Sequence, residues 1–207
     1  MADDNDGRKA GSIILRDLEL FNRAAVFMEF EIQPVVHSEV DAAIKEWAET
    51  RGWGSGGDGE ESFEELWVAP PQWHVEGDEW SAWFQLGRRE GHDSNSYQIA
   101  DLFGVGETEY GMRFLVDHGR FGGKSAWNSF SKTIGDLGQR LGERGWAHEG
   151  KGVFFRPLVL PAVVMAEAWA NEDWTAALEP LGRALDMLAE DIAIFDELVG
   201  RAAGERK

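Results

Sequence analysis

Residues 109–160 read EYGMRFLVDHGRFGGKSAWNSFSKTIGDLGQRLGERGWAHEGKGVFFRPLVL, and this stretch indicates the fold. Apolar residues alternate over 109–117 and are nearly continuous over 153–160, and both patterns are typical of β-strands. Between them, five apolar residues repeat at helical spacing: Trp127, Phe130, Ile134, Leu137 and Leu141. The stretch therefore predicts a strand, a glycine-rich turn, one amphipathic helix over 125–141 and a second strand.

Glycines recur on a neighbouring strip of that helix, at Gly135, Gly138 and Gly142. Glycine inside a helix costs about 1 kcal/mol relative to alanine. Three of them on one strip predict that another backbone packs closely there. The alternative is that Gly142 simply ends the helix.

Working outward, the periodicity predicts further strands over 26–32, 63–68, 79–86 and 97–103, and helices over 39–51 and 174–199. Pro34 is predicted to end the first strand, and Ser38 with Asp41 matches a capping box at the start of the first helix. Residues 12–22 fit either a helix or a strand. Residues 1–11 are predicted to be a disordered tail.

Strands follow one another from 63 to 117 without crossover helices, which argues against a parallel sheet. We therefore expect a single α+β domain over 12–203, with a flexible acidic loop at 54–61. Its sheet is expected to be mostly antiparallel or mixed, with about five to seven strands, and two or three long amphipathic helices should pack on one face.

Charge is the strongest signal of the composition. The 207 residues hold 20 Lys and Arg against 38 Asp and Glu, for a formal net charge of −18. Such a surface repels nucleic acid and anionic membranes and attracts basic proteins. The alternatives are solubility or a salt-rich habitat, and mimicry of DNA by carboxylates.

Some classes of protein are excluded or disfavoured. The chain has no cysteine, so it has no disulfide framework, thiolate metal site or cysteine nucleophile. No apolar run reaches the roughly 20 residues that span a bilayer, and no signal-peptide pattern is seen. The expectation is a cytoplasmic protein without a cofactor. The five histidines show no metal-ligand spacing, so no metal site is predicted, and each is expected to be a surface or turn residue.

A candidate anion site follows the strand at 109–117. The turn resembles the Walker A loop of nucleotide hydrolases, although His118 stands where that family has glycine. Free N–H groups at a helix start would hold an anion together with two basic side chains and a hydroxyl. The candidate residues are Arg120, Gly122, Gly123, Lys124 and Ser125. The alternative is a plain turn in which Ser125 caps the helix.

A looser pattern joins Asp117 to Glu149 and Lys151, and it resembles the metal site of PD-(D/E)xK nucleases. In that family two carboxylates hold Mg²⁺ and the lysine positions water. Here Glu149 and Lys151 precede the strand at 153–160, and the net charge opposes binding of DNA.

Tryptophan is abundant, with ten residues, of which four fall between 67 and 83. The odd spacing of Trp80 and Trp83 on one predicted strand places them on opposite faces, one in the core and the other exposed. An exposed tryptophan beside acids is typical of a binding surface. Candidate partner contacts are Trp73, Trp80, Glu179, Asp186, Glu190 and Glu197.

The leading hypothesis is thus an acidic interaction module for a partner with a basic surface. It includes inhibitors of the immunity or anti-defence type, DNA mimics among them, and no catalytic residue is assigned. The rival hypothesis is a protein that binds small anions or phosphate ligands, or a metal-dependent hydrolase, using the loop at 117–125. The apolar seam of the last helix, over 178–199, packs on the sheet or, alternatively, forms a homodimer.

Overall fold

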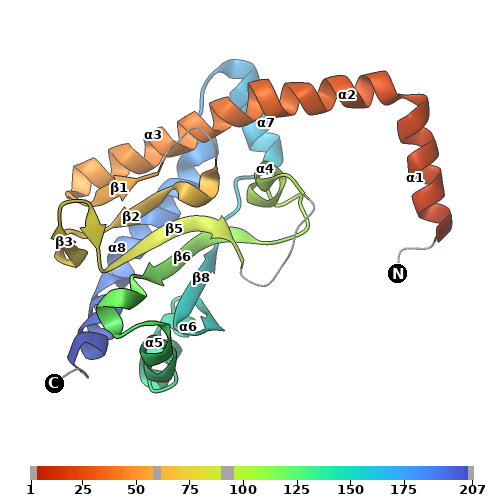
Figure 1. The fold of residues 1–207 in the computed structure, drawn as a ribbon. Coiled ribbons are helices and arrows are strands. Elements are labelled where there is room, and N and C mark those ends of the chain that lie inside the picture. Colours follow the sequence, from red (N-terminus) through yellow and green to blue (C-terminus); the bar gives the residue numbers. More distant parts are fainter. Residues whose placement is uncertain (1–3, 58–61, 90–95, 205–207) are drawn as a thin grey trace.

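The computed structural model describes residues 4–57, 62–89 and 96–204, and over these residues it is an α+β fold (Figure 1). The main sheet has six strands, all antiparallel, in the order β1–β2–β5–β6–β8–β7. Their bounds in that order are Gly54–Gly56, Trp67–Ala69, Ala82–Arg88, Tyr110–Val116, Val153–Pro157 and Ala147–Gly150. A separate hairpin joins β3 (His74–Glu76) to β4 (Glu79–Trp80). The predicted fold class is confirmed.

Helices make up the rest of the described structure. The α-helices are α1 (Asp4–Arg16), α2 (Leu18–Phe27), α3 (Gln33–Arg51), α4 (Gln98–Leu102), α5 (Lys124–Phe130), α6 (Gly135–Glu143), α7 (Ala162–Asn171) and α8 (Thr175–Gly204). A π-helical turn, η1 (Met28–Ile32), joins α2 to α3. Short 3₁₀ turns are η2 (Phe63–Glu65), η3 (Pro71–Trp73) and η4 (His118–Phe121).

One face of the sheet is buried beneath α3 and α8 (Figure 1). Phe84, Phe114 and Phe154 project from three neighbouring strands towards this face. The ring of Phe195 on α8 lies over all three, with centroid separations of 5.0, 4.7 and 6.0 Å. Aromatic pairs in such edge and tilted arrangements add to the free energy gained from burial. This layer is the centre of the hydrophobic core.

Three aspartates of α8 anchor three tryptophans at this face. Asp186 accepts a hydrogen bond from the indole of Trp47 at 2.9 Å. The Asp191 carboxylate accepts one from Trp146 at 2.9 Å. Asp196 accepts one from Trp73 at 2.8 Å. Tryptophan can be buried when its N–H finds an acceptor, so these carboxylates explain part of the tryptophan content.

The predicted strand over 26–32 is wrong, because α2 and η1 occupy this segment. Met28, Ile32 and Val36 lie four residues apart and contact the body along one helical stripe. Pro34 does not end a strand; it lies in the first turn of α3, just after the π-helical turn. Proline has no N–H to donate inside a helix, and a π turn is a common way to accommodate that loss.

Other N-terminal expectations also change. Helix α3 contains the predicted helix over 39–51 but begins at Gln33, so Ser38 lies inside it and is not a cap. Residues 12–22 are helical in α1 and α2, with a break at Asp17. The sequence predicts a disordered tail over 1–11, whereas its described part, from Asp4, belongs to α1.

Three further predictions need correction. The predicted strand over 97–103 is the short helix α4, and 63–68 is divided between η2 and β2. The predicted loop over 54–61 begins with strand β1, and residues 58–61 lie outside the described structure.

The predicted helix over 125–141 is two helices, α5 and α6, with a break between them. In the break, the hydroxyls of Ser131 and Thr133 donate to the backbone carbonyls of Asn128 and Phe130. Such local bonds compete with the helix. The five apolar residues that suggested one helix are nevertheless all buried.

Candidate functional site

The second face of the sheet is not covered by α3 or α8, and it carries a pocket of tryptophans. Trp67, Trp80 and Trp83 line this pocket together with Asp78 and Gln85, and its volume is about 280 Å³. All three indoles are half-buried, whereas Asp78 is exposed. We call these five residues the tryptophan pocket. It presents three aromatic surfaces and one carboxylate to solvent.

Strand β1 holds two of these indoles in place through its glycines. A Cβ at Gly54 would overlap the six-membered ring of Trp80, and one at Gly56 would lie 2.7 Å from the ring of Trp67. The two indoles therefore occupy the space beside Gly54 and Gly56 that side chains at these positions would fill. Trp67 and Trp80 contact each other at a centroid distance of 5.5 Å, and Trp83 donates to Gln85 Oε1 at 2.9 Å. The pocket walls are thus fixed by packing and by a hydrogen bond.

The spacing of Trp80 and Trp83 predicts that they lie on opposite faces of the sheet. This prediction is wrong, because both line the same pocket. They belong to two strands, β4 and β5, separated by Ser81, so the alternation of one strand does not relate them. Trp73, proposed as a partner contact, is instead 2% exposed and belongs to the core.

The four predicted acidic contacts lie on α8 and are already paired with arginines of the same chain. Glu179 pairs with Arg183 at 2.7 Å, and Asp186 pairs with Arg51 at 2.6 Å. Each of the other two does the same: Glu190 with Arg144 at 2.9 Å, and Glu197 with Arg140 at 2.6 Å and Arg201 at 2.5 Å. The four carboxylates on this face of α8 therefore all form ion pairs within the chain.

The candidate anion loop is placed between β6 and α5. The guanidinium of Arg120 pairs with Glu79 and with Asp117, so two carboxylates already compete for its charge. Gly122 and Gly123 have positive φ values of 86° and 88°, which glycine adopts without strain. Ser125 is exposed and makes no side-chain cap, because Gly123 is the N-cap residue. Lys124 is exposed at the first position of α5.

A larger pocket opens at the other end of α5, between α6 and the β7–β8 hairpin. Its volume is about 750 Å³. Two lysines and one histidine line it, along with Asn128, Ser131, Ile134 and glycines 135, 138 and 150; the three charged or titratable residues are Lys132, Lys151 and His148. We call it the lysine pocket. No carboxylate lines it, and no ion pair of Lys132 or Lys151 is found among the described residues.

The predicted close packing on the glycine strip is wrong. A Cβ at Gly135, Gly138 or Gly142 would meet no atom within 4 Å. Gly135 and Gly138 instead border the lysine pocket, where side chains at these positions would fill part of the space.

The turn between β7 and β8 supports one wall of the lysine pocket. Residues 150–152 all have positive φ, including Lys151 at 53°. Such a backbone is unfavourable for a residue with a side chain. A Cβ at Gly152 would approach within 2.5 Å of Trp127 Nε1, so the turn rests directly on that indole. His148 stacks on Phe154 with centroids 4.8 Å apart, and partial burial lowers the pKa of His148 from its ordinary value.

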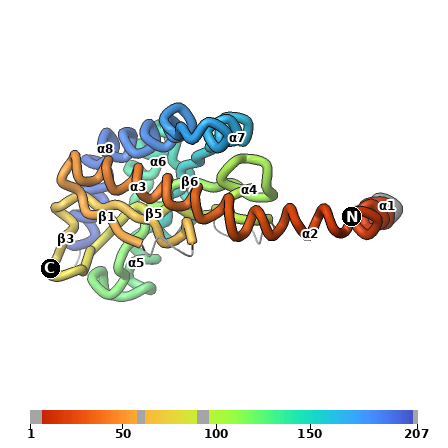
Figure 2. Tube along the Cα trace, turned by 90° about the horizontal axis from the view of Figure 1, so that it is seen from above, coloured from red at the N-terminus to blue at the C-terminus, as the bar shows by residue number. Residues whose placement is uncertain are grey.

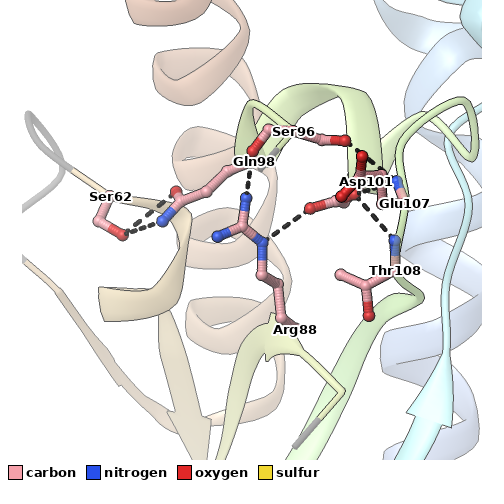
Figure 3. Close-up of polar contacts among 7 residues, drawn as sticks. All are labelled: Ser62, Arg88, Ser96, Gln98, Asp101, Glu107 and Thr108. Carbon is pink, nitrogen blue, oxygen red and sulfur yellow. Dashed lines mark hydrogen bonds and ion pairs between the residues drawn. The ribbon is translucent and has the colours of Figure 1, made fainter. Parts of the chain in front are cut away.

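A buried polar network lies at one end of β5 (Figure 3). Arg88 donates from Nε to Asp101 at 2.7 Å and from Nη2 to the carbonyl of Ser96 at 2.6 Å. Asp101 also accepts from the backbone N–H groups of Glu107 and Thr108, at 2.9 and 3.1 Å. Asp101 is 1% exposed, and its bonds tie α4 to β5 and to the turn before β6. We interpret this network as structural.

The loose nuclease pattern is not assembled into a metal site. Asp117 caps η4 by accepting from Gly119 at 2.9 Å, whereas Glu149 pairs with Arg89 at 3.0 Å. No cluster of three or more histidines and carboxylates suited to a metal ion occurs in the described parts of the chain. His37 is not a surface residue, since it is 3% exposed and packs on Phe63 at 4.8 Å.

No family model matches the chain, and neither a curated protein nor a solved structure shows significant similarity to it. Across the described residues, no helix has the length and apolar character needed to cross a membrane. The chemistry of the two pockets therefore carries the functional argument.

Proposed function

We propose that this protein binds a partner with a basic surface, and that the tryptophan pocket receives a cationic side chain of that partner. The observation that carries the proposal is the placement of three indoles and the Asp78 carboxylate around one opening. Aromatic faces attract ammonium and guanidinium groups, and the attraction is strongest for tryptophan. A neighbouring carboxylate adds a Coulomb term of the same sign.

The overall charge supports this choice of ligand. A formal net charge of −18 draws basic proteins towards the surface and repels nucleic acid. Near the pocket, Glu76 and Asp78 are exposed on the β3–β4 hairpin. A partner that uses its basic surface to hold nucleic acid would be blocked by this contact, which is the inhibitor form of the proposal.

The test compares a cationic ligand with an uncharged ligand of the same shape. Acetylated trimethyllysine methylamide and its neutral carbon isostere are titrated into protein labelled with ¹⁵N at the tryptophan indoles. We expect the cation to shift the resonances of Trp67, Trp80 and Trp83 and the isostere to leave them in place. Trp80→Ala should weaken binding of the cation about tenfold, as loss of a cation–π contact of roughly 1–2 kcal/mol implies.

Two further variants define the pocket. Gly54→Ala should also weaken binding, because the new Cβ displaces the Trp80 ring. Trp174→Ala, a half-buried tryptophan outside this pocket, should bind the cation as the unaltered protein does. Equal binding of the neutral isostere would refute cation recognition, as would shifts spread over all ten indoles.

We infer a second candidate function, the binding of small anions, from the lysine pocket. Lysine is rare in this chain, with six residues, and two of them face a single cavity that no carboxylate lines. Ammonium groups without a carboxylate partner in an acidic protein are suited to a phosphate or carboxylate group. This second candidate site lies at the opposite end of α5 from the predicted anion loop that contains Arg120.

Lys151→Gly separates binding from stability. Glycine adopts a positive φ freely, so the variant should gain roughly 1 kcal/mol in its free energy of unfolding. The same change removes a cation from the pocket and should weaken sulfate binding about tenfold, by loss of a charged hydrogen bond. Thermal denaturation and sulfate titration measure the two effects. A variant that binds sulfate as well as the unaltered protein would refute the site.

Binding of sulfate should also depend on pH. Partial burial lowers the pKa of His148 from its ordinary value and so favours its neutral form. Protonation adds a positive charge to the pocket, so affinity should rise as the pH falls through that lowered pKa. Sulfate stays doubly charged over this range and is therefore the suitable probe. The pH dependence should vanish in His148→Gln.

A further inference from the structure

The N-terminal arm, residues 4–32, extends away from the body of the molecule (Figures 1 and 2). It comprises α1, α2 and η1, and no residue of α2 or η1 is buried. A helix without a buried side gains little from tertiary packing, which is the main source of helix stability in proteins. The arm therefore lacks the contacts that the other long helices have.

The arm nevertheless has many large apolar residues, as helices that pack against other parts of a protein do. Val36, Val40 and Ile44 form the buried stripe of α3. The same stripe continues towards the N-terminus at Ile32 and Met28, which contact the body, and then beyond the body at Ala25, Phe21 and Leu18 of α2. Nine large apolar residues of the arm are at least 43% exposed: Ile13, Ile14, Leu15, Leu18, Leu20, Phe21, Val26, Phe27 and Phe30. Exposed apolar surface of this extent marks an interaction site.

An apolar groove lies where the arm meets the body. Its volume is about 240 Å³, and its walls come from η1, α3, α7 and the end of α4. Met28, Phe103, Met165 and Trp169 are among the lining residues. Phe27 of the arm contacts Trp169 edge to face at 6.1 Å. The groove thus extends the apolar surface of the arm onto the body.

Charge identifies a suitable occupant. The whole arm, residues 4–32, has four basic and six acidic residues, but its segment 8–23 holds all four basic residues with only two of the acidic ones. The body beside the groove is acidic, with Glu167, Glu172 and Asp173 all exposed. The segment 8–23 of one molecule is therefore complementary, in charge and in apolar character, to the groove of another.

We propose that the protein is a homodimer in which each arm packs on the groove and arm of a second copy. A twofold axis allows both arms to be covered at once by the same contact. The nine exposed apolar residues present roughly 900 Å² per copy, against about 800 Å² per partner in a stable interface of standard size. The dimer does not involve the tryptophan pocket.

The oligomeric state tests the proposal. Sedimentation equilibrium of the full chain should give twice the monomer mass of 23.1 kDa. The double variant Leu18→Glu with Phe21→Glu alters only exposed positions, so it should fold and sediment as a monomer. Asn22→Glu, also exposed on α2, should remain a dimer. A monomeric unaltered protein would overturn the proposal.

Cross-linking tests the geometry. Because the chain has no cysteine, single cysteines can be placed at Ile14 on the arm and at Ala166 in the groove. A mixture of the two variants should form a disulfide between copies. Absence of that product, with dimers linked elsewhere, would refute the arm-in-groove contact. Sedimentation of a monomer with anionic phospholipid vesicles would instead assign the arm to a membrane surface and would likewise overturn the dimer.

Discussion

Asp191→Ala is expected to lower the free energy of unfolding by about 3–5 kcal/mol, as removal of one partner from a buried ion pair does. The Asp191 side chain is fully buried in α8 and faces two arginines. Arg144 donates to it from Nε at 2.5 Å, and Arg156 donates from Nη1 at 3.1 Å. Trp146 donates its indole N–H at 2.9 Å. Removal of the carboxylate leaves the largely buried guanidinium of Arg156 without its partner.

The matched control is Asp186→Ala on the same helix. Asp186 also accepts an indole N–H, from Trp47, and also pairs with an arginine, but its side chain is 53% exposed. In this variant, water can hydrogen-bond to the groups that Asp186 leaves, so the free energy of unfolding should fall by only about 1 kcal/mol. Thermal denaturation should show a fall in Tm of roughly 10 °C for Asp191→Ala and a few degrees for the control. Equal shifts would contradict the larger contribution expected of the buried network.

The sequence predicts a helix or strand correctly where the pattern of apolar residues extends over many positions or where only one face of the element is buried. Strand β6 lies where apolar residues alternate over 109–117, and helix α8 contains the apolar seam predicted over 178–199. Short segments fail for a physical reason. From Val26 to Ile32, alternate residues are apolar, but Met28 and Ile32 also fit the helical stripe that leads to Val36. In so short a segment, the pattern of apolar residues cannot distinguish a strand from a helix.

The tryptophan pocket is only partly predictable. Trp80 is expected to bind a partner, but Trp67, Trp83 and Asp78 are not identified as its companions. They meet because β2 pairs with β5 and because the β3–β4 hairpin folds beside them, which are contacts that no local pattern encodes. The available signal was the pair of glycines in β1, since they leave room for indoles.

The lysine pocket was missed for a similar reason. Lys132 and Lys151 are distant in the sequence and meet across the space beside Gly135 and Gly138. In the described structure, the ion pairs of the acidic α8 face all involve arginine. Arginine thus stabilises the fold, because its planar fork suits fixed pairs. Lys132 and Lys151 have no such pair among the described residues, and this is why we propose them as ligands for an anion.

Asp101→Ala is expected to lower the free energy of unfolding by about 3–5 kcal/mol, and to do so through a different part of the fold. The variant leaves the Arg88 guanidinium without a carboxylate in a site where Asp101 is completely buried. It also removes the acceptor for the backbone N–H groups of Glu107 and Thr108 (Figure 3). A buried donor without an acceptor costs about 1–3 kcal/mol.

Hydrogen exchange locates the effect. The amides of Glu107 and Thr108 should lose protection in Asp101→Ala, whereas those of α8 should change only as global stability changes. Asp173→Ala is the control, because this exposed carboxylate also accepts a backbone N–H, from Thr175 at 3.1 Å. Its loss should cost about 1 kcal/mol. Because Asp101 and Arg88 are in contact, the double variant with Arg88→Ala should lose less stability than the sum of the single variants. Strict additivity would contradict the pairing and would reopen Asp101 to a role in binding.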